Sequence, residues 1–353
     1  MDPETYLAFS AVDLVAKSHV GATDIGKKRE SNKFNFFFAP QSSVTQYLTN
    51  RLRAGNCRVF LGGKIILGPK WDTFLISLCI YLALMLGLYF SAIQGAQEDE
   101  SPILVAIFVA TSVCGIVMML LTALTNPGIV PRNEAVGLAP GTDPKSVDST
   151  TGFLVPRYLL INGVCVRQKF CPTCKIYRPP RSNHCSICDN CVLKHDHHCV
   201  ALGTCVGLGN YRWFLILCAC MCVLFPVAFW IAKDRLFSIY YAEWPDVVPT
   251  AMDFLSSNAL LVLITVLSVV GIGAFGLLFL YHYFITVHNL TTNEHLKKYY
   301  KINPFDYSKW VNLKHALCYP QDILPVPEEL DVQASYRELA STNSECVSDF
   351  YDY

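Results

Sequence analysis

The chain has 353 residues, enough for two ordinary domains or for one membrane domain with cytosolic lobes. Of these residues, 52% are aliphatic, aromatic, Met or Cys and only 16% are charged, against about a quarter in a typical soluble domain. These values exclude a disordered protein and argue against an ordinary soluble enzyme. The 28 basic residues balance the 28 acidic ones, so no nucleic-acid partner is expected.

Four apolar stretches are each long enough to cross a bilayer, which takes about 20 helical residues. They cover residues 74–93, 103–125, 213–232 and 257–285, and none contains Asp, Glu, Lys or Arg. Buried helices of a large soluble protein are the alternative, but the stretches lack amphipathic periodicity. The sequence therefore predicts four transmembrane helices.

The distribution of Lys and Arg predicts how these helices are oriented. The segment before the first span carries ten of them, the loop 126–210 nine, and the chain after residue 285 six. The short loop 94–101 carries none. Because cytosolic loops are enriched in Lys and Arg, both termini and the large middle loop are expected in the cytosol. No cleavable signal peptide is expected, since the first span begins past residue 70.

Cysteine and histidine are concentrated in the middle loop. Seven of the 16 cysteines lie between residues 171 and 205, together with four histidines. The cytosol keeps thiols reduced, which disfavours a disulfide scaffold. The Cys-x-x-Cys spacing occurs three times, at residues 171–174, 185–188 and 188–191, and this spacing lets two thiolates reach one tetrahedral zinc ion. The loop is therefore expected to bind zinc.

Two closed zinc sites use eight of these eleven side chains and leave three. The tripeptide His197-His198-Cys199 cannot point at one metal, so a spare thiol beside a spare imidazole is expected, as in an activated nucleophile. A third, looser metal site or an idle surface cysteine is the alternative. Cys199 lies about a dozen residues before the third span, so its thiol should sit at the bilayer surface. Acyl-CoA, with a charged head and a fatty chain, is a substrate that fits this location.

The segment Asp196-His197-His198-Cys199 makes the chain resemble the DHHC protein acyltransferases, which S-palmitoylate other proteins. Five further segments resemble family motifs and follow in the family's order. They are Asn126-Pro127-Gly128, where the family usually has Asp-Pro-Gly, the cysteine-rich run 182–191, Asn210-Tyr211-Arg212-Trp213-Phe214 at the third span, the TTxE motif Thr291-Thr292-Asn293-Glu294, and Asn312 in the C-terminal aromatic and Asn motif.

The resemblance implies a metal-ligand set and a catalytic set. One zinc would take Cys171, Cys174, His184 and Cys191, and the other Cys185, Cys188, His198 and Cys205. His195 is the third spare residue. Asp196 would orient His197, and His197 would take the proton from Cys199. The two Zn²⁺ ions would be structural, because a Cys₃His shell leaves no position for a catalytic water.

The implied reaction transfers an acyl group through the enzyme. The Cys199 thiolate attacks palmitoyl-CoA or another acyl-CoA, and a cysteine of a membrane-associated client protein then takes the acyl group. By resemblance, Thr292 approaches Asp196, although a simple helix cap is the alternative. Glu294 is expected to support a juxtamembrane turn, and Asn312 to stabilise packing.

Four positions near Cys199 depart from the family pattern. His195 stands where the family commonly has an aromatic residue, Met or Arg, and Val200, Ala201 and Thr204 stand where it usually has Pro, Trp and Asn. A weakly active or non-catalytic zinc-bearing membrane scaffold that binds client proteins is therefore the alternative function. A transporter is disfavoured, because the spans lack charged residues for a solute path. Arg178 and Arg181 could bind CoA phosphates or lie on a solvated face.

The expected fold is an all-α polytopic membrane protein of four transmembrane helices, with a cytosolic zinc-binding cysteine-rich domain between helices 2 and 3. In chain order, the expected divisions are a cytosolic N-terminal segment (1–70), helices 1 and 2 (71–125), a cytosolic linker (126–168), the cysteine-rich DHHC zinc domain (169–212), helices 3 and 4 (213–286), the TTxE and Asn-containing segment (287–325) and an acidic flexible tail (326–353).

Two expectations about cellular context rest on the resemblance alone. The stretch from Gly55 to Pro69 resembles the pre-membrane segment of the Ras-palmitoylating branch and its plant and protist relatives, in which some members need a small accessory subunit. A Golgi or other endomembrane is the expected location, with the plasma membrane as the next alternative. Cys318 and Cys346 are candidate secondary acylation sites, and the intramembrane cysteines are expected to be apolar fillers.

Overall fold

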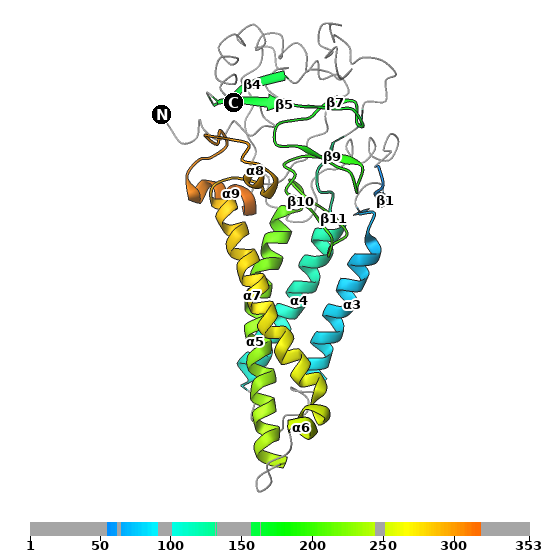
Figure 1. The fold of residues 1–353 in the computed structure, drawn as a ribbon, viewed down its shortest axis with the longest axis vertical. Helices are drawn as coiled ribbons and strands as arrows, with labels where there is room; N and C mark the ends of the chain where they lie inside the picture. Colours follow the sequence, from blue (N-terminus) through cyan, green and yellow to red (C-terminus); the bar gives the residue numbers. More distant parts are fainter. Residues whose placement is uncertain are drawn as a thin grey trace, which may run out of the picture.

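The computed structural model describes residues 55–61, 65–90, 101–130, 132, 157–162, 164–243 and 251–318. The acidic tail, Cys346 and the loop of acidic residues 98–100 lie outside the described residues. Long helices form a tapering bundle, and short strands cover its wider end together with the C-terminal helices (Figure 1).

The described residues include seven helices, four of which are long and apolar enough to cross a membrane. These four are α3 (Trp71–Leu88), α4 (Pro102–Leu124), α5 (Tyr211–Glu243) and α7 (Ala259–Val287). The shorter helices are α6 (Ala251–Ser257), α8 (Thr292–Leu296) and α9 (Lys309–Cys318). The chain therefore has the four helices expected of an integral membrane protein.

The third long helix extends well past the predicted end of its span at residue 232. Lys233, Asp234 and Arg235 interrupt the apolar run but not the helix, because backbone hydrogen bonds and not apolar side chains define a helix. Its 33 residues correspond to about 50 Å at helical rise, whereas the hydrocarbon core is about 30 Å thick. The charged residues therefore end the apolar part of α5 and leave a helical extension outside the bilayer core.

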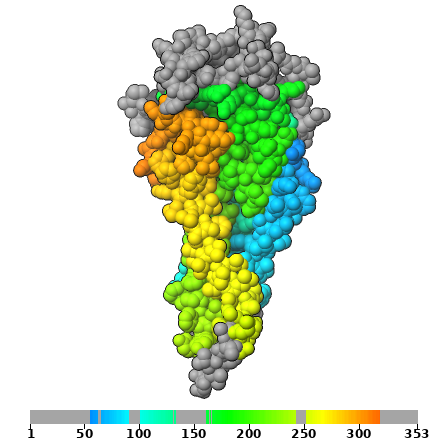
Figure 2. Space-filling view, viewed as in Figure 1, coloured from blue at the N-terminus to red at the C-terminus, as the bar shows by residue number. Residues whose placement is uncertain are grey.

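Helix α5 is the central helix of the bundle. In an apolar 18-residue window of each candidate span, 44% of the α5 residues are buried, against 22% in each of the other three helices. It packs against α4 on one side and α7 on the other, and the bundle narrows toward the α6 end (Figure 2). The outer face of α7 exposes apolar side chains such as Leu277 and Leu280. An exposed apolar face of this size suits contact with lipid.

The described residues include eleven short strands, which lie at the wider end of the helix bundle (Figure 1). The expectation of an all-α fold is therefore wrong for the segments outside the membrane helices. The strands form antiparallel sheets of two or three strands. Cysteine-rich segments too short for a helical core fold instead into hairpins whose turns bring ligand side chains together. The strands are β1 (Arg58–Phe60), β2 (Ile65–Leu67), β3 (Ile129–Val130), β4 (Arg157–Ile161), β5 (Val164–Gln168), β6 (Phe170–Cys171), β7 (Ile176–Tyr177), β8 (Asn183–Cys185), β9 (Asn190–Val192), β10 (His197–Cys199) and β11 (Thr204–Val206).

Two asparagines join the strands to the helix bundle. The fully buried Asn210 donates from its Nδ2 to the carbonyl oxygens of Thr122 and Cys205, both at 2.9 Å, which ties the end of α4 to β11. Asn126 accepts the backbone N–H groups of Gly128 and Ile129 through its Oδ1, at 2.9 and 3.0 Å. The amide oxygen of Asn126 thus makes the turn that an aspartate would make after the second span.

Where α5 crosses α7, Gly271 leaves room for an aromatic ring. A Cβ atom at Gly271 would lie 2.4 to 2.6 Å from three ring atoms of Phe225, and Phe225 stacks on Phe275 with ring centroids 5.1 Å apart. A methyl group at Gly271 would therefore push the Phe225 ring toward Phe275. Gly273 and Gly276, on the same helix, have nothing within 4 Å of a built Cβ.

We expect Gly271→Ala to destabilise the bundle, because overpacking of a filled contact costs about 1–3 kcal/mol. The thermal unfolding midpoint of the full chain in detergent should fall by several degrees. Gly273→Ala is the matched control and should leave the midpoint unchanged or raise it slightly, since alanine favours a helix over glycine. Equal midpoints for the two variants would contradict the close contact at Gly271.

Candidate active site

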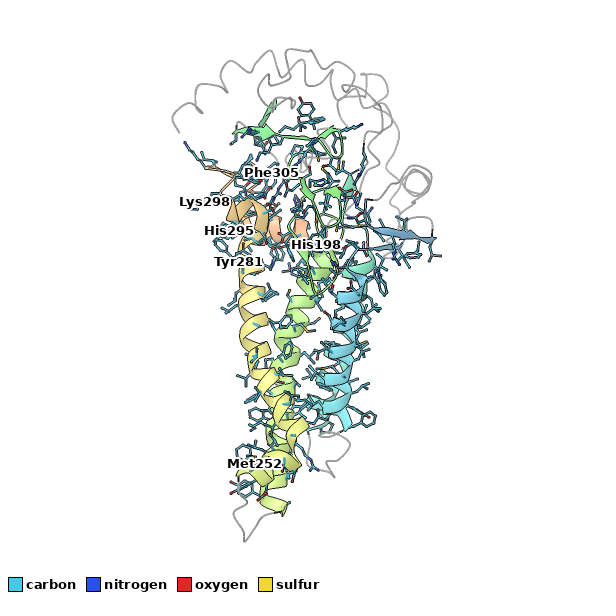
Figure 3. The ribbon with its side chains drawn as sticks, turned by 45° about the vertical axis from the view of Figure 1, so that its right-hand side comes forward. His198, Met252, Tyr281, His295, Lys298 and Phe305 are labelled. Atoms are coloured by element: carbon cyan, nitrogen blue, oxygen red, sulfur yellow. The ribbon has the colours of Figure 1, made fainter. Side chains whose placement is uncertain are left out.

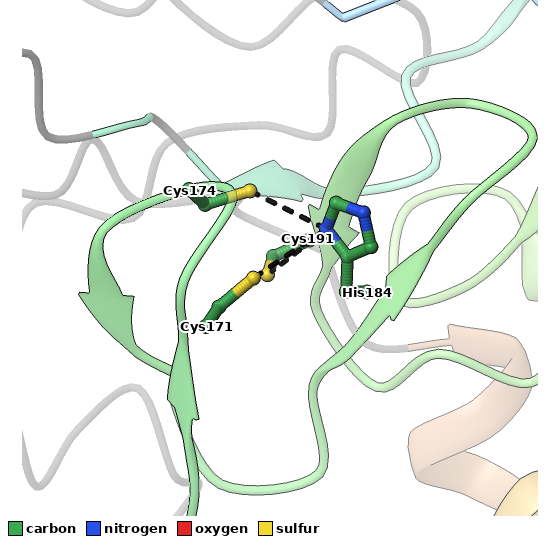
Figure 4. Close-up of side chains that lie close together, drawn as sticks. All are labelled: Cys171, Cys174, His184 and Cys191. Atoms are coloured by element: carbon green, nitrogen blue, oxygen red, sulfur yellow. Dashed lines mark hydrogen bonds between the residues drawn. The ribbon is translucent and has the colours of Figure 1, made fainter. Parts of the chain in front are cut away.

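The first cluster of possible metal ligands joins Cys171, Cys174, His184 and Cys191. The sulfur atoms lie 3.5, 3.5 and 3.9 Å from His184 Nδ1 (Figure 4). Zn–S bonds of about 2.3 Å and Zn–N bonds of about 2.0 Å at tetrahedral angles separate S from N by about 3.5 Å. The four side chains therefore fit around one tetrahedral ion.

The second cluster has the same composition and the same size. The sulfur atoms of Cys185, Cys188 and Cys205 lie 3.7, 3.4 and 3.7 Å from His198 Nδ1. The buried His195 is close to this cluster, with its Nε2 3.7 Å from the sulfur of Cys205. The two groups of four are the ligand sets that the family resemblance implied, and both could hold a metal ion.

Strand register explains how adjacent residues serve different sites. In β8 and β9, His184 lies opposite Cys191, and both belong to the first cluster. The next residue, Cys185, points to the other face of the strand and belongs to the second cluster. In β10 and β11, His198 lies opposite Cys205, which again pairs two ligands of one cluster.

The same alternation separates His198 from its two neighbours. Successive side chains of a strand point to opposite faces, so His197 and Cys199 share the face that His198 does not use. Cys199 packs against the apolar core of the bundle at the point where α5 begins. The structure thus leaves one imidazole and one thiol outside both clusters, on the side of the membrane helices.

Asp196 is buried and forms hydrogen bonds with both His197 and Thr292. Its Oδ2 lies 2.7 Å from His197 Nδ1 and accepts the Thr292 hydroxyl at 2.7 Å, while its Oδ1 accepts the Thr292 backbone N–H at 2.8 Å. Burial alone would raise the pKa of Asp196, but its hydrogen bond with His197 and the positive charge of that imidazole hold the pKa below its ordinary value. Asp196 is therefore held as a carboxylate that orients the imidazole.

The imidazole of His197 links the carboxylate to the thiol. Because Nδ1 faces Asp196, Nε2 remains for Cys199, whose thiol interacts with the same ring. Burial lowers the pKa of His197, but the hydrogen bonds with Asp196 and Cys199 outweigh it and raise the pKa to about 9. An imidazole with this pKa readily takes a proton from a nearby thiol and holds the resulting thiolate.

Comparisons with known proteins agree with this geometry. Residues 165–299 match the family profile described as DHHC palmitoyltransferase. The chain is 32% identical over 286 residues to Palmitoyltransferase ZDHHC18 of Homo sapiens, an alignment covering 75% of this chain and 70% of that protein. The chain belongs to the DHHC palmitoyltransferase family.

Other members of the DHHC family are similar to the chain over a smaller share of their own length. It is 33% identical over 301 residues to Palmitoyltransferase ZDHHC14 of Danio rerio. It is 31% identical over 281 residues to Probable protein S-acyltransferase 5 of Arabidopsis thaliana. Each alignment covers 75% of this chain but only 57% of the relative, so the chain spans somewhat more than half the length of these proteins.

A buried ion pair joins the cysteine-rich region to α8, next to the DHHC residues. Glu294 accepts two hydrogen bonds from Arg181, at 2.9 Å from Nε and 2.7 Å from Nη2. Arg181 also donates to Asn289 and lies over the ring of Phe305, 4.6 Å from its centroid. Both proposed roles of Arg181, phosphate binding and surface solvation, are wrong for this structure.

Glu294 and Asn312 hold the chain that follows the last membrane helix. Glu294 completes a capping box with Thr291 at the start of α8, and the Arg181 charge keeps the pKa of its carboxyl low despite burial. Asn312 is buried and donates from Nδ2 to the carbonyl oxygen of Val287 at 2.8 Å, which caps the end of α7. The contacts of both side chains join the C-terminal segment to Arg181 and to the end of α7. Figure 3 shows this region around the labelled His295, Lys298 and Phe305.

Two membrane-helix residues beside His197 were given no role in the site from the sequence. His282 of α7 lies 5.8 Å from His197 between ring centroids, and its Nδ1 is 3.2 Å from the Tyr211 hydroxyl of α5. The distances among Asp196, His197 and His282 would also allow a metal ion, and two of these three side chains, Asp196 and His197, are hydrogen-bonded to each other. A lone titratable residue inside an apolar span was the signal that could have found His282.

We expect Arg181→Lys to destabilise the protein, because lysine cannot reproduce the planar fork that binds Glu294 and Asn289. The loss of charge-assisted hydrogen bonds should cost about 1.5–3 kcal/mol, measured as a lower thermal midpoint in detergent. Arg178→Lys is the matched control, since the partly buried Arg178 donates from Nη1 to the side-chain oxygen of Asn183 at 2.9 Å and forms no part of the Glu294 pair. An unchanged midpoint for Arg181→Lys would show that the planar fork of hydrogen bonds contributes nothing to stability beyond the charge itself.

Proposed function

We propose that the chain is a protein S-acyltransferase that moves a long-chain acyl group, such as palmitoyl, from acyl-CoA to cysteine thiols of client proteins. The observation that carries the proposal is the position of Cys199. Its thiol lies outside both metal-ligand clusters, beside the His197–Asp196 pair, and against the apolar core of the membrane helices. A thioester at the bilayer surface can reach a thiol in that position while its acyl chain stays among apolar side chains.

In the first step, His197 takes the proton of Cys199, and the sulfur attacks the carbonyl carbon of the acyl-CoA thioester. The carbon–sulfur bond to CoA breaks, and CoA leaves as a thiol after taking the proton from His197. Asp196 stabilises the imidazolium between these events and fixes the ring with Nε2 toward the sulfur. The product is an acyl-Cys199 thioester.

In the second step, His197 takes the proton of a client cysteine, and the client sulfur attacks the acyl-Cys199 carbonyl. The bond to Cys199 breaks, and the proton returns to its sulfur, so no other reactant is consumed. Thr292 supports both steps, because its hydroxyl and backbone N–H hold Asp196 in place. It positions the carboxylate and does not touch the reacting atoms.

Each Cys₃His cluster is proposed to hold one structural Zn²⁺, with four protein ligands and no open position. A zinc ion in such a site supplies fixed geometry and takes no part in the acyl transfer. The first ion would join β6, β8 and β9, and the second would join β8 to β10 and β11. The catalytic strand β10 would thus be held from the face opposite to Cys199.

The charge distribution supports an orientation with both termini, the cysteine-rich domain and the C-terminal segment in the cytosol. The clients are then membrane-associated proteins with cytosolic cysteines. A Golgi or other endomembrane is the proposed location. The resemblance of the pre-membrane segment to the Ras-palmitoylating branch supports a small accessory subunit as a partner.

We expect the purified chain to contain two zinc ions, measured by elemental analysis against protein concentration. Cys171→Ser and Cys185→Ser should each lower the content below two ions, because each removes a ligand from a different cluster. Cys79→Ser is the matched control, since Cys79 is an exposed residue of α3, and it should keep both ions. Two ions in the Cys171→Ser or Cys185→Ser variant would contradict the assigned ligands.

We expect the detergent-solubilised chain to become labelled by radioactive palmitoyl-CoA, with the label released by hydroxylamine as a thioester. Cys199→Ser should abolish this label, and His197→Ala should slow labelling by at least about 100-fold, the usual scale of general acid–base catalysis. Cys318→Ser, which changes an exposed cysteine of α9, should leave the rate unchanged.

Three outcomes would change the proposal. Label that persists in Cys199→Ser would assign the chemistry to another cysteine. If Cys318→Ser alone lost the label, the acylated cysteine would be Cys318 of α9. A folded, zinc-loaded wild type that stays unlabelled, even with an accessory subunit, would support the scaffold function instead.

A further inference from the structure

In the turn that follows Cys199, Leu202 is buried in the core of the helix bundle, but the two residues next to Cys199 have few contacts of their own. The turn runs from Val200 to Gly203 and connects β10 to β11. Val200 has 65% of its surface exposed, and Ala201 is also exposed, so neither is fixed by packing. The turn contains no proline, the residue that would lock a backbone angle. One internal hydrogen bond, from Gly203 N to Val200 O at 3.1 Å, closes it.

A segment before the first membrane helix lies directly against this turn. The backbone N–H of Lys70 donates to the carbonyl oxygen of Gly203 at 3.3 Å. A Cβ atom on Gly68 would lie 2.0 Å from Gly203 O, and one on Gly203 would lie 2.1 Å from Lys70 O. Gly203 also has a φ of +66°, which favours glycine. The two backbones therefore approach as closely as they do because both positions are glycine.

Thr73, in the first turn of α3, adds a side-chain contact to the same turn. Its hydroxyl donates to the backbone carbonyl oxygen of Val200, the residue after Cys199, at 2.7 Å. The hydroxyl oxygen is also 2.7 Å from Lys70 O, and one hydroxyl proton is shared between these two acceptors. The hydroxyl thus joins the start of α3 to the residue next to the nucleophile.

The other end of the pre-membrane segment is fixed to the second cysteine and histidine cluster. Asn56 donates from its backbone to Cys188 O and from its side chain to Ile187 O, both at 3.0 Å. A Cβ on Gly55 would lie 2.5 Å from the same Cys188 oxygen. Between these ends, β1 and β2 form an antiparallel hairpin. The hairpin is therefore attached both to the cluster that holds β10 and to the turn that follows Cys199.

We propose that residues 55–61 and 65–73 form a clamp that positions the acyl-accepting Cys199, with Thr73 as its positioning residue. The clamp joins the start of the first membrane helix to the Val200–Gly203 turn. The position of the Cys199 sulfur relative to the helix bundle is therefore fixed. Positioning of this kind affects the rate of the chemical step more than the binding of acyl-CoA. The role in catalysis rests on the proposed acyltransferase function, whereas the restraint of the turn does not.

The test compares three full-length variants in detergent: Thr73→Val, Thr73→Ser and Thr111→Val. Thr73→Val keeps the shape of the side chain and removes the hydroxyl, and Thr73→Ser restores a hydroxyl. Thr111→Val is the matched control, because the half-buried Thr111 of α4 donates within its own helix, to the carbonyl oxygens of Ile107 and Phe108. Zinc content and thermal midpoint confirm that all variants fold.

The first readout is hydrogen exchange of the backbone amides of residues 199–206, which needs no acyl transfer. Thr73→Val should exchange several-fold faster there than the wild type, while Thr73→Ser and Thr111→Val should exchange like the wild type. Unchanged exchange in Thr73→Val would overturn the clamp, whatever activity the chain shows.

The second readout is the rate of auto-acylation as a function of palmitoyl-CoA concentration. Thr73→Val should lower the maximal rate about three- to tenfold, the effect of losing one hydrogen bond, with an unchanged half-saturating concentration and recovery in Thr73→Ser. Faster exchange with a wild-type rate would overturn the positioning role. Faster exchange in a chain whose wild type is never acylated would disprove the enzyme function and retain the clamp as a restraint on the turn.

Discussion

The pairing of β10 with β11 decides which side chains can meet at the site. Three consecutive residues, His197, His198 and Cys199, carry metal-binding or nucleophilic groups. An extended backbone sends the middle one to the face opposite to its neighbours, and Cys205 stands opposite His198 to complete that face. In a helix the three side chains would spread around the axis at about 100° intervals, and this division would be lost. A hairpin is therefore required, and the all-helical expectation could not have accommodated the site.

Asp196 connects this hairpin to the distant end of the chain. Its carboxylate accepts two hydrogen bonds from Thr292, which begins α8. Arg181 and Glu294 form a second connection between the same two regions, and both side chains are almost completely buried. A buried ion pair tolerates few alternative arrangements, because moving either partner leaves an unpaired charge in a poor solvent. The C-terminal segment thus takes a single position against the cysteine-rich domain, and Thr292 reaches Asp196 as a result.

The sequence could predict features whose pattern lies within one short stretch of the chain. Apolar run length found the four long helices, and Cys-x-x-Cys spacing found the ligand-rich loop, because both patterns lie within a few turns of chain. Arg181 and Glu294 are 113 residues apart, and nothing near Arg181 distinguishes it from a solvated arginine. The contact between Thr292 and Asp196, 96 residues apart, was reachable only through the family resemblance. Strands of two or three residues, such as β6 and β10, are too short to show an alternating pattern.

The overlap of the two ligand sets along the chain has a consequence for how the protein matures. Cys185 and Cys188 of the second set lie inside the loop that the first set closes between Cys171 and Cys191. Once an ion closes that loop, half of the second set is already gathered, and the remaining closure costs less chain entropy. During synthesis the first set also leaves the ribosome before Cys205 does. With the proposed zinc ions, binding at the first set would prepare the second set, and β10, which carries His198 and Cys199, would be fixed last.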